Sequence, residues 1–176
     1  MADLSNAVIN VIKESIRLEI NGRGFFEHAE SVTHNELGKK MFRKLAQDEI
    51  GHLTTFGQLF TSVIGSEDWK KFVHEEELKG KSSVIEELKA RIAKEEKEDR
   101  SGELEAIRIG MTLERNAIDF FEKSASETSD TKTKTIFNKI CDEERFHYDL
   151  LQAQYDYVTN SGFWFDIAEF RMDGKY

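Results

Sequence analysis

Two segments of the sequence carry the same pair of potential metal ligands, a glutamate followed three residues later by a histidine. These segments are Glu49–His52 and Glu144–His147. Residues three apart lie on one face of a helix, so each pair presents a carboxylate and an imidazole to a common point. A further glutamate precedes each segment by thirty residues. The candidate metal ligands are therefore Glu19, Glu49, His52, Glu114, Glu144 and His147.

The two sets of candidate ligands belong to an internal repeat with an offset of 95 residues. The same offset superposes their neighbours, namely Leu18 on Leu113, Asn21 on Asn116, Phe26 on Phe121 and Phe42 on Phe137. One Glu-x-x-His pair means little in a chain rich in glutamate, but two copies with matching upstream glutamates make chance a poor explanation. The repeat indicates a duplicated structural unit built around the candidate ligands.

Four glutamates gathered inside a fold require cations, because neighbouring carboxylates repel one another and resist the loss of water. Two divalent ions neutralise four carboxylates, and so do two trivalent ions with a bridging oxide. Glutamate oxygens with one histidine nitrogen per metal suit iron or manganese, whereas zinc prefers fewer ligands and more histidine or cysteine. The pattern therefore predicts a site for two iron ions per chain, with manganese or a mixed pair as the alternative.

Four neighbouring residues have two interpretations each. Asp48 and Glu143 precede the two Glu-x-x-His pairs at equivalent positions. Each either accepts the free N–H of a ligand histidine, which would fix its tautomer, or is a solvated helix residue. Tyr148 and Tyr155 either act near the site as redox-active or hydrogen-bonding groups or pack with a wet hydroxyl.

The spacing of apolar residues predicts four long helices that position the ligands. They span about residues 4–29, 35–63, 102–128 and 130–160. Each candidate ligand occupies an inward position on an otherwise apolar stripe. Residues 31–35 are expected to form the turn of the first hairpin, which places Glu19 and Glu49 at matching heights roughly 20 Å from that turn. The second pair of helices repeats this arrangement.

The segment between the hairpins sets the topology. Residues 64–101 are long enough to run the length of the bundle, and Ser83 with Glu86 resembles a capping box that opens a helix. One long crossover between two hairpins is a known four-helix-bundle topology. The sequence thus predicts an all-α four-helix bundle over residues 1–160 with a partly helical crossover. The aromatic tail, residues 161–176, is expected to dock on the bundle or on a partner subunit.

Composition narrows the class of protein. The 176 residues are 39% hydrophobic, which suffices for one domain with a core. The net charge of −9 argues against nucleic acid as a partner. No apolar run approaches the length of a membrane span and the N-terminus lacks the core of a signal peptide, so a cytoplasmic protein with no membrane contact is expected. Cys141 is the only cysteine, and we interpret it as a small buried apolar side chain.

With these motifs in place, residues 4–160 resemble the rubrerythrin-like branch of the ferritin-like superfamily. The resemblance rests on the six candidate ligands and on Phe26 and Phe121, which lie two turns after Glu19 and Glu114. It implies a ferritin-like bundle in which the six residues bind two iron ions. It further implies that Glu49 and Glu144 bridge the ions and that Glu19 and Glu114 bind terminally.

The chain departs from this family in two respects. Rubrerythrins proper carry a rubredoxin-like domain with paired Cys-x-x-Cys motifs, whereas this sequence has one cysteine, so its electrons are expected from a separate donor such as a rubredoxin-like protein. Rubrerythrins also tend to have an extra glutamate one turn away on the third helix. Here Met111 and Ala117 flank Glu114 at that spacing, which makes a symmetric six-ligand site.

Three functions are compatible with the sequence. The first is a di-iron oxidoreductase that reduces hydrogen peroxide or dioxygen and acts as a homodimer, by resemblance. The second is a ferroxidase or iron-handling protein, for which Fe(II) is the substrate. The third is a helical bundle that holds metal only structurally or acts as an interaction module. Metal content and the reaction of the Fe(II) form with each oxidant would separate them.

Overall fold

The computed structural model describes residues 2–79, 86, 90 and 101–173. The described helices are α1 (Ala2–Val32), α2 (Glu36–Ile64), α3 (Trp69–Leu78), α5 (Ser101–Glu127), α6 (Thr131–Ser161) and α7 (Ile167–Asp173). No strand occurs among these residues. The predicted all-α fold is confirmed, and the four long helices agree with the expected spans to within three residues. Of the helix expected to open at Ser83, the structure describes only Glu86 and Ala90, and both are helical.

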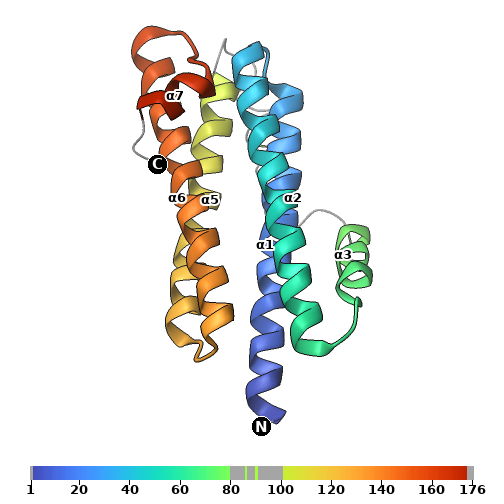
Figure 1. The fold of residues 1–176 in the computed structure, drawn as a ribbon. Helices are drawn as coiled ribbons and strands as arrows, with labels where there is room; N and C mark the ends of the chain where they lie inside the picture. Colours follow the sequence, from blue (N-terminus) through green and yellow to red (C-terminus); the bar gives the residue numbers. More distant parts are fainter. Residues whose placement is uncertain (1, 80–85, 87–89, 91–100, 174–176) are drawn as a thin grey trace.

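The four long helices form two antiparallel hairpins, α1 with α2 and α5 with α6 (Figure 1). Helix α2 ends at the same end of the bundle at which α1 begins, whereas α5 begins at the opposite end (Figure 1). The two helix ends that the α2–α5 connection joins, the end of α2 and the start of α5, therefore lie at opposite ends of the bundle, which is consistent with the predicted long crossover. Helix α3 begins this connection and lies beside α1 and α2.

Side-chain caps and glycines define the ends of the helices. The Asn35 side chain accepts hydrogen bonds from the N–H groups of Leu37 and Gly38 at the start of α2. Gly65 and Gly162 end α2 and α6 in the left-handed region, with φ of 78° and 76°. The first turn is shorter than expected, because α1 continues through Val32 in the absence of a helix-breaking residue.

One buried carboxylate joins the first turn to the second hairpin. Glu103, near the start of α5, accepts hydrogen bonds from the backbone N–H groups of His34 and Asn35 at 2.7 and 3.2 Å. These two donors precede or open a helix and have no partner within it. The contact fixes the end of one hairpin against the other.

The core consists of two aromatic-rich clusters separated along the bundle. One cluster contains Phe26 and Phe42, and the other contains the mutually packed rings of Phe56, Phe121 and Phe137. On each of the four long helices, the candidate ligands lie in sequence between residues of the two clusters. The apolar layers above and below the ligands therefore exclude water from them.

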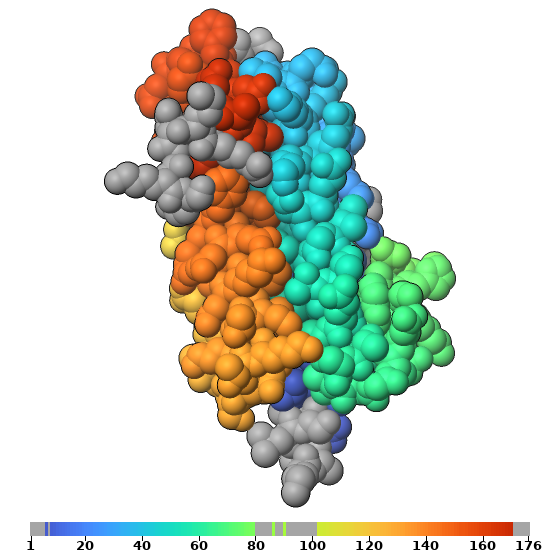
Figure 2. Space-filling view, viewed as in Figure 1, coloured from blue at the N-terminus to red at the C-terminus, as the bar shows by residue number. Residues whose placement is uncertain are grey.

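Two tryptophans attach the shorter segments to the bundle. The Trp69 ring of α3 covers Gly57 of α2, where an added Cβ would meet ring atoms at 2.4 Å. Trp164 packs edge-on against Phe42 with ring centroids 6.3 Å apart. Figure 2 shows α7 lying across the ends of α2 and α6. None of the described helices has the length and hydropathy needed to span a membrane.

Candidate metal centre

The structure brings all six candidate ligands together in the interior of the bundle. Helices α1 and α5 supply Glu19 and Glu114, while α2 and α6 supply the two Glu-x-x-His pairs. The exposed fraction of each of the six residues is between 1% and 3%. Charged side chains are almost never buried this completely unless they are paired or bind a metal. The duplicated spacing thus produces one shared cluster rather than two separate ones.

The Nδ1 atoms of the two histidines point into the cluster. His52 Nδ1 lies 3.0 Å from Glu144 Oε1 and 3.2 Å from Glu19 Oε2. His147 Nδ1 lies 3.0 Å from Glu144 Oε2 and 3.5 Å from Glu114 Oε1. The two rings are stacked with their centroids 5.8 Å apart. Each imidazole therefore presents one nitrogen to Glu144 and to the glutamate of α1 or α5.

The donor atoms form two overlapping groups of four. The first group is Glu19, Glu49, His52 and Glu144, and the second is Glu49, Glu114, Glu144 and His147. Within each group, one donor atom per residue lies within 4.8 Å of all the others. Because both Glu49 and Glu144 belong to both groups, each has a carboxylate placed to contact two ions at once. This is an arrangement for a dinuclear centre.

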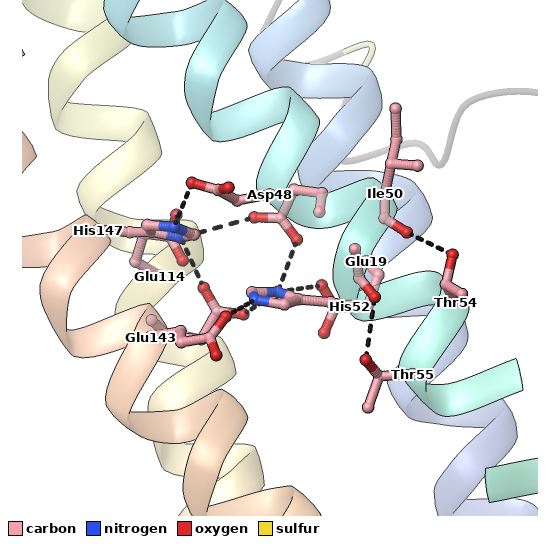
Figure 3. Close-up of polar contacts among 12 residues, drawn as sticks. Glu19, Asp48, Ile50, His52, Thr54, Thr55, Glu114, Glu143 and His147 are labelled. Atoms are coloured by element: carbon pink, nitrogen blue, oxygen red, sulfur yellow. Dashed lines mark hydrogen bonds and ion pairs between the residues drawn. The ribbon is translucent and has the colours of Figure 1, made fainter. Parts of the chain in front are cut away.

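The outer nitrogens of the histidines bind carboxylates of the opposite hairpin. His52 Nε2 of α2 lies 2.9 Å from Glu143 Oε2 of α6, and His147 Nε2 of α6 lies 3.3 Å from Asp48 Oδ2 of α2 (Figure 3). Lys44 and Lys139 form equivalent ion pairs with Asp48 and Glu143. A carboxylate on the outer nitrogen holds the N–H there and leaves the inner nitrogen for a metal. The sequence placed both acids beside the motifs but did not show that they pair crosswise.

The electrostatics of the metal-free cluster follow from this crowding. Burial and the nearby Glu49 and Glu144 carboxylates raise the pKa of Glu19 well above its ordinary value, and burial with the Glu144 carboxylate does the same for Glu114. Burial disfavours charged imidazoles, but hydrogen bonds to carboxylates outweigh it and raise the pKa of His52 and His147. Burial also opposes ionisation of Glu144, yet its contacts with both histidines lower its pKa.

The charge and the donor atoms of the cluster indicate whether divalent metals fit it. The four buried carboxylates of the cluster carry four negative charges when ionised, and two divalent cations would neutralise them. In addition, the Oε1 atoms of Glu19 and Glu114 are buried without a hydrogen-bond partner. A buried carboxylate oxygen without a partner is costly, and a bound cation would satisfy it. The residues present therefore fit a pair of metal ions in both charge and donor atoms.

A cavity of about 240 Å³ borders the cluster between α1 and α5. Glu19 and Glu114 line it together with Asn21 and Asn116, which are equivalent in the internal repeat. Its remaining walls are mainly apolar. The repeat had placed these asparagines at matching positions, but nothing in the sequence showed that they would share a cavity with the ligands.

The other residues that the sequence singled out make contacts outside the two groups of donor atoms. Arg115 donates to Tyr148 Oη at 2.6 Å, and the Arg108 guanidinium lies over the Tyr155 ring. Cys141 is buried, and its thiol contacts the backbone carbonyl of Ile118. The remaining histidines, His28, His34 and His74, belong to neither group of donor atoms.

Comparison with known proteins agrees with this geometry. A family model for rubrerythrin matches residues 10–155, which is most of the chain. No curated protein and no solved structure matches the sequence. The chain belongs to the rubrerythrin family.

Proposed function

We propose that this member of the rubrerythrin family binds two iron ions in the buried cluster and reduces hydrogen peroxide or dioxygen with electrons from a separate donor. The ligands in this proposal are Glu19, Glu49, His52, Glu114, Glu144 and His147. The observation that carries it is the overlap of two four-donor groups through Glu49 and Glu144. A structural site for a single ion would not need a second group of this kind.

The donor set favours iron over zinc. Each group offers three carboxylates and one imidazole, and no thiolate. Zinc in proteins is usually four-coordinate with more histidine or cysteine, whereas carboxylate-rich sites with imidazole suit iron and manganese. Manganese, or one ion of each kind, is the alternative occupant.

In this proposal, each kind of residue has a separate task. Glu49 and Glu144 would each contribute a carboxylate to both ions, and Glu19 and Glu114 would each contribute to one. Asp48 and Glu143 keep the histidine Nδ1 atoms directed inward through the outer hydrogen bonds. When bound, two iron ions supply the two electrons that, with two protons, convert hydrogen peroxide to two waters. The cavity between α1 and α5 admits the oxidant.

The test is metal content followed by reaction with each oxidant. Protein purified without chelator is expected to hold two irons per chain, and the Fe(II) form is expected to react faster with hydrogen peroxide than with dioxygen. Stopped-flow absorbance measures both rates. Less than one metal per chain, with no uptake on reconstitution, would contradict the proposal.

One observation favours iron handling as a second candidate function. On the α2/α6 side, a recess reaches His147 and is lined by three carboxylates, Asp48, Asp142 and Glu143, and by two lysines, Lys44 and Lys139. The one additional acidic group gives the recess a net negative charge, which attracts cations and suits an entry route for Fe(II). Preference for dioxygen with sustained oxidation of added Fe(II), and exchange of bound iron, would support this function over peroxide reduction.

A further inference from the structure

The cavity beside the cluster has more room than hydrogen peroxide or dioxygen requires. Its volume is about 240 Å³. A water molecule occupies roughly 30 Å³ in the liquid, and an engineered apolar cavity of about 150 Å³ in another protein binds benzene. The cavity can therefore hold a ligand of about six non-hydrogen atoms or more by the same measure.

The walls of the cavity suit an organic group. Leu18 and Leu113 lie at equivalent positions on α1 and α5, and Phe26 and Ala117 extend the apolar surface. Gly22 keeps the α1 side open, since a Cβ there would come within 3.2 Å of Glu49 Cδ. An alkyl or aryl group placed against these side chains gains free energy in proportion to the apolar area removed from water.

The polar groups of the cavity suit an oxygen-bearing end. Glu19 and Glu114, each with a buried Oε1 that lacks a hydrogen-bond partner, line the cavity where it meets the cluster. Asn21 and Asn116 also line it, and neither side-chain amide has a hydrogen bond within the described part of the chain. Each amide offers two N–H donors to a ligand oxygen. A ligand with one oxygen-rich end and one apolar end matches both parts of the cavity.

We propose that the cavity between α1 and α5 makes this site a reductase of organic hydroperoxides, with the alkyl or aryl group held by Leu18, Leu113 and Ala117. A donor protein supplies two electrons in two successive one-electron transfers, and solvent supplies two protons. The reaction breaks the O–O bond of ROOH and yields ROH and water. This substrate class rests on the proposed redox function of the cluster.

The activity test compares two peroxides across three proteins. The parent chain is expected to reduce tert-butyl hydroperoxide with a kcat/KM within tenfold of that for hydrogen peroxide. Ala117→Leu fills part of the cavity and is expected to lower kcat/KM for tert-butyl hydroperoxide at least tenfold more than for hydrogen peroxide. Ala168→Leu makes the same change at an exposed position of α7 and is expected to alter neither value. If Ala117→Leu left the ratio of kcat/KM for tert-butyl hydroperoxide to that for hydrogen peroxide unchanged, the proposal would be overturned.

A binding series tests the cavity without turnover. Acetate, propionate and butyrate are titrated calorimetrically into the Fe(II)-loaded protein under argon. Each added methylene is expected to lower Kd about fourfold in the parent chain, the gain typical of burying one such group. The dependence of Kd on the number of methylene groups in the carboxylate is expected to disappear in Ala117→Leu, whose metal content is measured in parallel.

The two measurements separate the inference from the function on which it rests. Equal Kd values for the three carboxylates, with reduction of hydrogen peroxide intact, would overturn the organic substrate and leave the proposed function standing. A Kd that falls with each added methylene of the carboxylate, with reduction of neither peroxide, would overturn the redox chemistry. Affinity that rises with the length of the carboxylate supports the organic substrate. It supports the redox function as well if Ala117→Leu loses kcat/KM specifically for tert-butyl hydroperoxide.

Discussion

Between α1 and α5 the buried cluster borders a cavity with apolar walls, whereas between α2 and α6 it borders charged side chains. On the first side, Glu19 and Glu114 each keep a buried oxygen without a hydrogen-bond partner. On the second side, both histidines bind an outer carboxylate, and each of those carboxylates pairs with a lysine. Figure 3 shows the two outer carboxylates reaching the rings from opposite helices.

This contrast indicates that the two sides of the cluster have different roles. Side chains with several partners are held in one orientation, as the outer hydrogen bonds do for His52 and His147. Carboxylates with an unpaired oxygen beside a cavity retain the capacity to change their contacts. We therefore expect ligand exchange on the α1/α5 side, while the α2/α6 side holds the ions in place.

The largest expected effect distinguishes shared from unshared glutamates. Glu49→Ala or Glu144→Ala removes a donor from both groups, so either change is expected to abolish binding of the metal pair. Glu19→Ala or Glu114→Ala removes a donor from one group and is expected to leave one ion bound. Elemental analysis gives metal per chain, with Glu27→Ala as the exposed control. Two metals retained in Glu49→Ala would refute the ligand assignment.

The next effect tests the crosswise outer contacts. Glu143→Ala is expected to lower the affinity for the ion beside His52 by about 10- to 100-fold. Asp48→Ala is expected to lower the affinity for the ion beside His147 by a similar factor. Competitive titration with a metal chelator measures both affinities. Asp142→Ala, an exposed neighbour paired with Arg145, provides the control. Equal affinities in all three variants and the parent would mean that the outer carboxylates do not position the rings.

A third effect concerns the dependence of stability on pH in the metal-free protein. Glu19 and Glu114 have raised pKa values, so the folded chain retains protons that the unfolded chain releases above pH 4.5. The raised pKa values of the histidines act in the same direction above pH 6.5. The free energy of unfolding is therefore expected to fall as pH rises from 5 to 8, by about 1.4 kcal/mol per unit for each extra proton held.

Urea denaturation at several pH values measures this slope. The lowered pKa of Glu144 costs stability only on acidification below pH 4.5, outside that window. The double variant Glu19→Gln with Glu114→Gln keeps neutral side chains in both positions and is expected to flatten the slope between pH 5 and 6.5. Metal binding becomes tighter as pH rises because the ligands lose their protons, so the loaded protein is expected not to share the decline.

The smallest effect compares two glycines of α1. At Gly24 an added Cβ has open space, so Gly24→Ala is expected to stabilise the protein by about 0.5–1 kcal/mol through helix propensity. At Gly22 the Cβ would lie 3.2 Å from Glu49 Cδ, so Gly22→Ala is expected to gain less and to weaken metal binding severalfold. Thermal melts and metal titrations measure both. Identical behaviour of the two variants would show that Glu49 tolerates the contact without moving.

The sequence was informative where the relevant distance lies within one hairpin. Helical periodicity and the thirty-residue spacing predicted that Glu19 would lie level with Glu49, and the repeat predicted the same for the second hairpin. The pairing of His52 with Glu143 was not predictable, because it depends on how one hairpin is rotated against the other. The same holds for the cavity, since Asn21 and Asn116 reach it from different hairpins. The contact of Trp69 with Gly57 had no signal in the local pattern.

The crosswise hydrogen bonds also bear on the ancestry of the chain. Each hairpin supplies an outer carboxylate only to the histidine of the other, so neither copy can complete a site alone. A single hairpin associated with an identical second hairpin through a twofold axis would nevertheless contain every group required. Fusion of two such copies preserves the centre and frees the halves to diverge, as Asp48 differs from Glu143 and Gly22 from Ala117. The metal centre can thus be older than the polypeptide that now encloses it.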